Sequence, residues 1–77
     1  SRVQWVHTGK ADLLALRLES DGTVLAIDRS GRVTILDGEN GEPARDWSLE
    51  SGPLTDLYLT GSHLLYANEA GEVGHYD

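Results

Sequence analysis

The side chains best suited to chemistry near neutral pH are three histidines, His7, His63 and His75. Imidazole can transfer protons and bind metal ions. The spacing of the three matches neither H-x₃-H nor HExxH, the patterns that place two ligands on one side of a metal. We therefore predict no metal site and expect packing or surface roles for all three. The chain has no cysteine, which also excludes thiolate ligands and thiol nucleophiles.

Other catalytic and cofactor-binding patterns are missing from the sequence as well. No serine stands in a G-x-S-x-G segment, so a Ser-His-Asp triad is not predicted. The glycines of DGENGE (37–42) form neither G-x-G-x-x-G nor a phosphate-binding loop, and the acids around them lack the order of a calcium loop. We predict that the protein is not an enzyme and uses no cofactor.

The charge of the chain is strongly acidic, with 13 acidic side chains, 6 basic ones and a formal net charge of −7. Nucleic acid is disfavoured as a partner because phosphates need basic side chains to neutralise them. Residues 38–77 carry eight acids and one base, Arg45, which suits a solvated surface or, as an alternative, a face that attracts a cationic partner. No apolar run approaches the roughly 20 residues of a membrane helix, so no membrane role is expected. No signal peptide is visible, and the compartment stays open.

Short stretches of alternating apolar and polar residues, separated by turns, run through the chain. In LLALRLE (13–19), for example, the apolar side chains fall on alternate positions, which favours a strand over a helix. Asp21-Gly22 and the glycines of residues 37–42 are typical turn residues. The sequence predicts an all-β protein with strands over residues 3–7, 13–19, 23–28, 32–37, 44–50, 54–60, 64–68 and 72–76.

One pattern recurs along the chain. TVLAIDRSGRVTILD (23–37) and HLLYANEAGEVGHYD (63–77) align without a gap, with Asp37 on Asp77, which gives a period of 40 residues. Repeats of short strands at this period are typical of propeller blades. Trp5 in VQWVHTG resembles Trp47 in RDWSLESG, so residues 3–7 correspond to the fourth strand of a blade. The expected strand order is D-A-B-C-D-A-B-C, with strand D of an adjoining blade in residues 1–10, a first blade in 11–50 and strands A–C of a second in 51–77.

These stretches resemble known propeller families. DGTVLAIDRSGRVTILDGENGE and SGPLTDLYLTGSHLLYANEAGEVGHYD look like WD40-type repeats and are also similar to the quinoprotein-type (PQQ-like) repeat. The resemblance implies four-stranded antiparallel blades, about two per chain. It also implies that Trp5 and Trp47 pack between blades.

Two blades leave large apolar faces in water and unpaired strand edges. Circular closure removes both. The expected partners are therefore further copies of the chain, as a trimer with six blades or a tetramer with eight, or the remaining blades of a larger propeller.

We expect a non-enzymatic scaffold that binds a protein or peptide through loops on one rim. The candidate rim residues are Lys10, Asp28, Arg29, Glu50, Asn68 and Glu69. One alternative is an oligomeric lectin in which Trp5 and Trp47 stack on sugars between blades. Another is a fragment of a larger quinoprotein-like or WD40 propeller.

Overall fold

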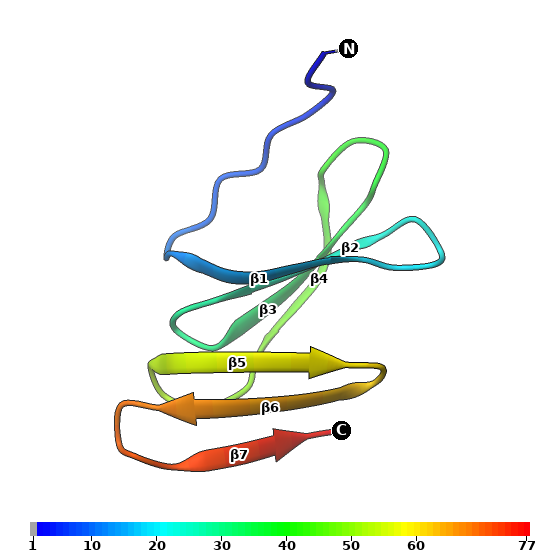
Figure 1. The fold of residues 1–77 in the computed structure, drawn as a ribbon. Coiled ribbons are helices and arrows are strands. Elements are labelled where there is room, and N and C mark those ends of the chain that lie inside the picture. Colours follow the sequence, from blue (N-terminus) through cyan, green and yellow to red (C-terminus); the bar gives the residue numbers. More distant parts are fainter. Residues whose placement is uncertain (1) are drawn as a thin grey trace.

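The computed structural model describes residues 2–77, and this part of the chain contains seven strands and no helix. The first four strands form one antiparallel sheet in the order β1-β2-β3-β4, and the last three form a second, in the order β5-β6-β7 (Figure 1). Within residues 2–77, no helix is present that could cross a membrane. The strands are β1 (Leu13–Leu18), β2 (Val24–Asp28), β3 (Arg32–Leu36), β4 (Pro43–Ser48), β5 (Leu54–Thr60), β6 (His63–Asn68) and β7 (Val73–Tyr76).

Seven of the eight predicted strands are confirmed, with ends that shift by at most two residues. The strand predicted over residues 3–7 is wrong, because residues 2–12 form no strand. A strand needs a neighbouring backbone to pair with. The strand that this segment would complete, β7, lies at the far end of the molecule, whereas residues 2–12 lead into β1 (Figure 1). Within residues 2–77 the second sheet consequently has three strands, and β7 pairs there with β6 alone.

The two sheets share their pairing register across the 40-residue spacing. Val24 pairs with Leu36 in the first sheet, and Leu64 pairs with Tyr76 in the second. At the start of each sheet, Leu13 pairs with Asp28 and Leu54 with Asn68, and the register shifts directly after both pairs. The sequence period is therefore reproduced in the hydrogen-bonding pattern, including the irregularity.

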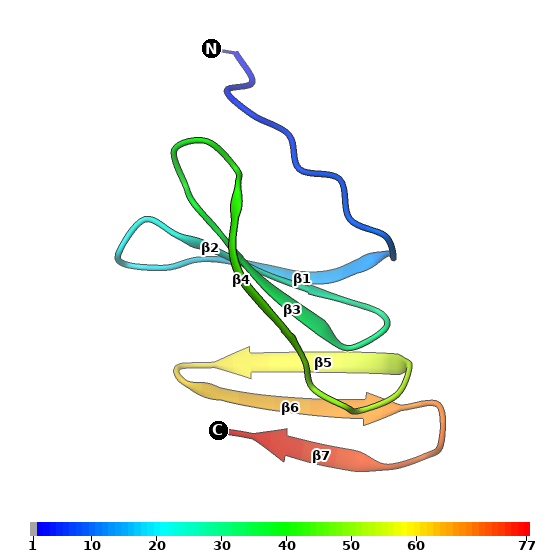
Figure 2. The same ribbon diagram turned by 180° about the vertical axis from the view of Figure 1, so that it is seen from behind.

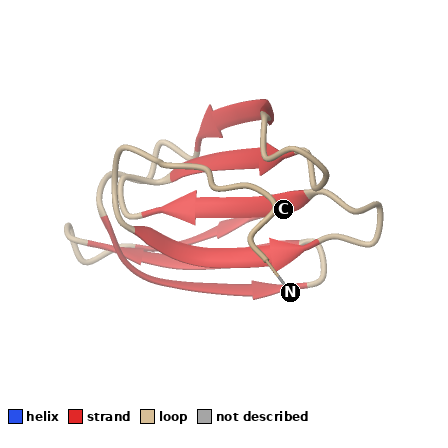
Figure 3. Ribbon diagram, turned by 90° about the horizontal axis from the view of Figure 1, so that it is seen from above, coloured by secondary structure: helices blue, strands red, loops and turns tan. Residues whose placement is uncertain are grey.

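The core lies between the two sheets. Its buried members are Leu25, Ile27 and Val33 from the first sheet and Leu54 and Leu64 from the second. Because successive side chains of a strand point to opposite faces, each sheet has one face on this core and one face turned away from it. Both sheets are open, and no ring closure is present in the described chain (Figures 2 and 3).

Candidate functional site: a loop rim and two open sheet faces

Four loops meet at one end of the molecule, where the β2–β3 and β6–β7 turns lie beside residues 8–12 and 49–53 (Figure 1). Backbone hydrogen bonds join them: Arg29 N donates to Asp12 O at 2.7 Å and Glu69 N to Pro53 O at 3.0 Å. Leu54 N also donates to the carbonyl oxygen of Arg29 at 2.7 Å, which links the two sheets. The predicted rim residues thus lie on neighbouring loops that are tied together through the backbone.

The β2–β3 and β6–β7 turns have the same design. Asp28 Oδ1 accepts hydrogen bonds from the Ser30 and Arg32 amides at 2.9 and 3.1 Å. In the second turn, Asn68 Oδ1 accepts from the Glu72 amide at 2.9 Å. A side chain that binds its own turn in this way holds the loop in one conformation.

Asn68 is more deeply involved in the structure than the other rim candidates. Its side chain is buried, and its amide donates to the carbonyl oxygen of Ser51 at 2.8 Å and to Glu72 Oε1 at 2.9 Å. A buried amide with three hydrogen bonds positions loops rather than contacting a ligand. Lys10, Arg29, Glu50 and Glu69 are exposed, and the Arg29 guanidinium also donates to the carbonyl oxygen of Leu54 at 3.4 Å.

A groove of about 540 Å³ lies between residues 7–11 and the outer side of the first sheet. Lys10 and Asp28 line it, together with Arg32 and Asp46, whose side chains form an ion pair at 2.8 Å. The groove therefore offers charges of both signs beside a segment whose backbone is not paired in a sheet. Such a surface suits an extended polypeptide.

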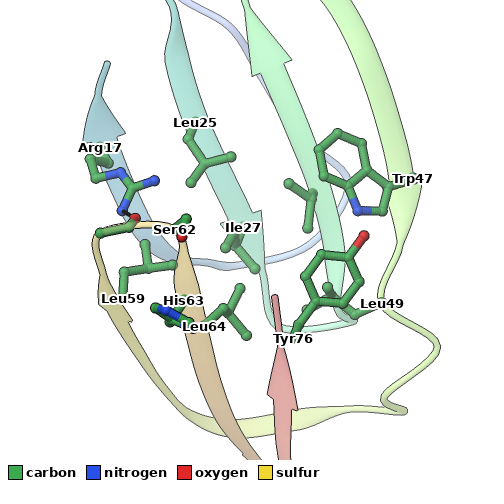
Figure 4. Close-up of a pocket in the computed structure, with 12 residues that line it drawn as sticks. Arg17, Leu25, Ile27, Trp47, Leu49, Leu59, Ser62, His63, Leu64 and Tyr76 are labelled. Atoms are coloured by element: carbon green, nitrogen blue, oxygen red, sulfur yellow. Dashed lines mark hydrogen bonds between the residues drawn. The ribbon is translucent and has the colours of Figure 1, made fainter. Parts of the chain in front are cut away.

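The two tryptophans have different surroundings. Trp5 donates its indole N–H to the carbonyl oxygen of Gly38 at 2.9 Å, and its ring lies against Gly41. Trp47 packs against the core, with the Arg45 guanidinium 5.2 Å from its ring centre. The Trp47 indole nitrogen is buried and has no hydrogen-bond partner in residues 2–77. It borders a mainly apolar cavity of about 110 Å³ between the sheets (Figure 4).

Two of the three histidines lie close together in the structure. His63 and His75 lie on neighbouring strands with Nδ1 and Nε2 3.0 Å apart, whereas His7 lies on the other side of the first sheet, in the groove. The predicted hairpin over 63–77 was the sequence signal for this proximity. Two strands that pair across a short turn bring together side chains that are 12 positions apart in the sequence. Patterns built for helices and loops do not detect this.

The fold thus defines an all-β protein of two open antiparallel sheets, of four and three strands, without a helix in the described residues. No protein-family profile matches the chain. No curated protein sequence matches it either.

Proposed function

We propose that this chain is a non-enzymatic repeat scaffold. Its sheet faces assemble with sheets of the same kind into a propeller-like ring, and its loop rim binds a protein or peptide. The observation that supports the assembly is the relation between the faces that are packed and those that are open.

The two sheets pack against each other through faces that are not equivalent under the 40-residue repeat. The first sheet contributes Leu25, Ile27 and Val33 to the core, and the second contributes residues such as Leu64, Leu57 and Tyr66. When the positions are related by the 40-residue period, Leu25 corresponds to Leu65 and Leu64 to Val24. Neither Leu65 nor Val24 lies in this core. The two sheets thus pack through non-equivalent faces, as neighbours do in a head-to-tail array.

The outward faces are the counterparts of the packed ones. We call the outward side of the first sheet the first open face. Its exposed apolar members are Leu16 and Leu18, whereas Ala26 and Leu36 on the same side are already buried within the single chain. Leu16 and Leu18, which are 65% and 75% exposed, occupy the positions that Leu57 and Leu59 fill in the core.

We call the outward side of the second sheet the second open face, with apolar members Tyr58, Leu65, Ala67 and Val73. Val73, which is 80% exposed, occupies the position of Val33, and Leu65 that of Leu25. The first open face of one unit therefore fits the second open face of the next. Exposed apolar area of this kind marks an interaction surface.

Closure of such an array gives a ring of copies, or a ring completed by further blades. The place beside β7, which carries no strand, is where a fourth strand would pair, and residues 3–7 of the next unit have the matching sequence. Ring formation would give those residues the partner strand that they lack in a single unit. The rim would then repeat around one end of the ring, with Lys10, Arg29, Glu50 and Glu69 available to a polypeptide ligand.

The lectin alternative draws no support from this geometry. The Trp5 ring lies against Gly41, and Trp47 packs in the core with Arg45 beside its ring. Both arrangements use the indoles for packing rather than for stacking on a sugar.

The experiment is sedimentation equilibrium of the chain and of one lysine variant on each face, Leu18→Lys and Val73→Lys. We expect a discrete trimer or tetramer for the parent chain and monomers for either variant alone. An equimolar mixture should form a dimer, because Leu18→Lys leaves the second open face intact and Val73→Lys leaves the first. Ser20→Lys, an exposed turn position, is the control for the added charge and should assemble like the parent.

A parent chain that stays a monodisperse monomer would exclude assembly from copies. Variants that fail to dimerise when mixed would exclude the head-to-tail arrangement. Peptide binding at the rim is a separate property, tested by phage display on the parent chain and on Arg29→Ala. Loss of selected binders in the variant is the expected result, and equal recovery from both would contradict a rim site.

A further inference from the structure

His63 and His75 form a pair at the opposite end of the second sheet from the rim. The His63 Nδ1 and His75 Nε2 atoms are 3.0 Å apart, and the two ring centres lie 5.1 Å apart with the ring planes inclined by 21°, so the rings meet edge to edge. Asp77 brings a carboxylate oxygen to 3.4 Å from the same His63 Nδ1. The His63 side chain is about half exposed, at 51%, so solvent and ions reach the pair.

The hairpin holds this geometry in place. His75 pairs directly with Leu65, and His63 precedes Leu65 by two residues, so both rings project from the same face. The corresponding positions of the first sheet hold Thr23 and Ile35. The histidine pair therefore occurs in the second sheet alone, and the packing that the repeat gives to both sheets does not explain it.

The arrangement of the two nitrogens is chemically unusual. Both point at one another, so one must carry a proton and the other must present a lone pair. A metal ion can replace that proton, since zinc binds imidazole nitrogen at about 2.0–2.1 Å, which places two ligands of a tetrahedral site roughly 3.3 Å apart. To bind a metal the pair must open by a few tenths of an ångström, and each ring must turn by roughly 35° so that both lone pairs aim at one ion.

We propose that His63 and His75 form a two-nitrogen clip for a divalent transition-metal ion of the kind that imidazole favours, such as Cu²⁺, Ni²⁺ or Zn²⁺. Two nitrogen–metal bonds form, the shared proton leaves to solvent, and water completes the coordination. No group of three or more histidine, aspartate or glutamate side chains in residues 2–77 is arranged to hold a metal, so two protein ligands are the extent of the site. The Asp77 carboxylate, which lies beside His63, offsets part of the positive charge of the bound ion.

The proposal does not require the scaffold function, but the pair lies on the second open face beside Leu65, which the proposed assembly would cover. The test is isothermal titration of the intact chain with ZnCl₂, NiCl₂ and MgCl₂. The titration is therefore repeated on Leu18→Lys, which is expected to be monomeric and to leave this face uncovered. We expect saturable binding of one Zn²⁺ or Ni²⁺ per chain, release of protons that depends on the buffer, and no response to Mg²⁺. His63→Gln and His75→Gln should each weaken binding at least tenfold, and Asp77→Asn should weaken it less.

His7→Gln is the matched control, because it removes a histidine far from the pair and should bind as the parent does. Circular dichroism establishes that each variant is folded, and the ¹⁵N shifts of the histidine rings report zinc coordination at Nδ1 of His63 and Nε2 of His75. Absence of saturable binding below millimolar metal would overturn the proposal. So would equal loss in His7→Gln, or a stoichiometry of one ion per two chains.

Discussion

The Asn68 side-chain amide donates a hydrogen bond of 2.8 Å to the carbonyl oxygen of Ser51, and both residues are buried. This bond joins the β6–β7 turn to the loop that enters β5, 17 residues earlier in the chain. It places a polar network under the rim, where the two sheets meet. Buried polar groups are costly when one partner is removed, so the bond can be tested by substitution.

Asn68→Ala should lower the free energy of unfolding by about 1–3 kcal/mol, because it leaves the Ser51 carbonyl and the Glu72 amide without these partners. Urea denaturation followed by circular dichroism measures the change. Glu69→Ala, on the exposed neighbour, is the control and should unfold at nearly the parent midpoint. Equal midpoints for both variants would show that Asn68 does not hold the loops together.

Gly31 and Gly71 are equivalent turn residues in different surroundings. Both have positive φ angles, 90° and 81°, where an alanine costs roughly 1–2 kcal/mol. A Cβ on Gly31 would collide with the Ser51 hydroxyl, whereas a Cβ on Gly71 would enter open space. Gly31→Ala should therefore destabilise the protein more than Gly71→Ala, as measured by thermal unfolding.

Both variants bear the cost of a positive φ angle, so the difference between their melting temperatures reports the collision with Ser51 alone. Adding Ser51→Ala to Gly31→Ala removes the colliding hydroxyl and should recover part of the excess loss. Ser51→Ala added to Gly71→Ala should recover nothing. Equal melting temperatures for the two single variants would contradict the close approach of the turn and the loop.

Trp5 attaches the N-terminal segment to the β3–β4 turn through its bond to Gly38. Trp5→Ala should free this segment and raise the rate of tryptic cleavage after Lys10 several-fold, because residues 2–12 have no strand pairing of their own. Limited proteolysis with mass spectrometry follows the cut. Val6→Ala, at a neighbouring exposed position, should be cleaved at the parent rate, and an unchanged rate in Trp5→Ala would show that the indole does not hold the segment.

The strands were predictable because alternation and turn residues are local properties. LTDLYLT gave the bounds of β5 directly, and the 40-residue period gave the matching registers of Val24–Leu36 and Leu64–Tyr76. Residues 3–7 have the same local pattern, but a strand also needs a neighbour, and the pattern does not report whether one is present. The prediction failed there for that reason.

Two features of the candidate sites depend on contacts between segments far apart in sequence. Asparagine is a common residue in exposed turns, so the sequence gives no sign that Asn68 is buried. Its burial depends on the loop that holds Ser51, which packs against the turn. The proximity of His63 and His75 depends on the pairing of Leu65 with His75. This pairing sets the register of the two strands, which the spacing of the histidines in the sequence does not reveal.

Asp21 gives a prediction about acid stability. In the β1–β2 turn its Oδ1 accepts hydrogen bonds from the Thr23 hydroxyl at 2.6 Å and the Thr23 amide at 3.0 Å. These bonds favour the ionised carboxylate and lower the pKa of Asp21 below its ordinary value of 3.8. A carboxyl whose pKa is lowered on folding stabilises the fold fully at a pH above its pKa in the unfolded chain. This contribution is lost as the pH falls through its pKa in the folded protein.

The difference in the free energy of unfolding between the parent and Asp21→Asn should therefore be constant near neutral pH and shrink below about pH 4. Urea midpoints from pH 2 to 7 measure it, with Asp12→Asn as the control for loss of one exposed charge. A gap that widens as the pH falls would contradict the assignment.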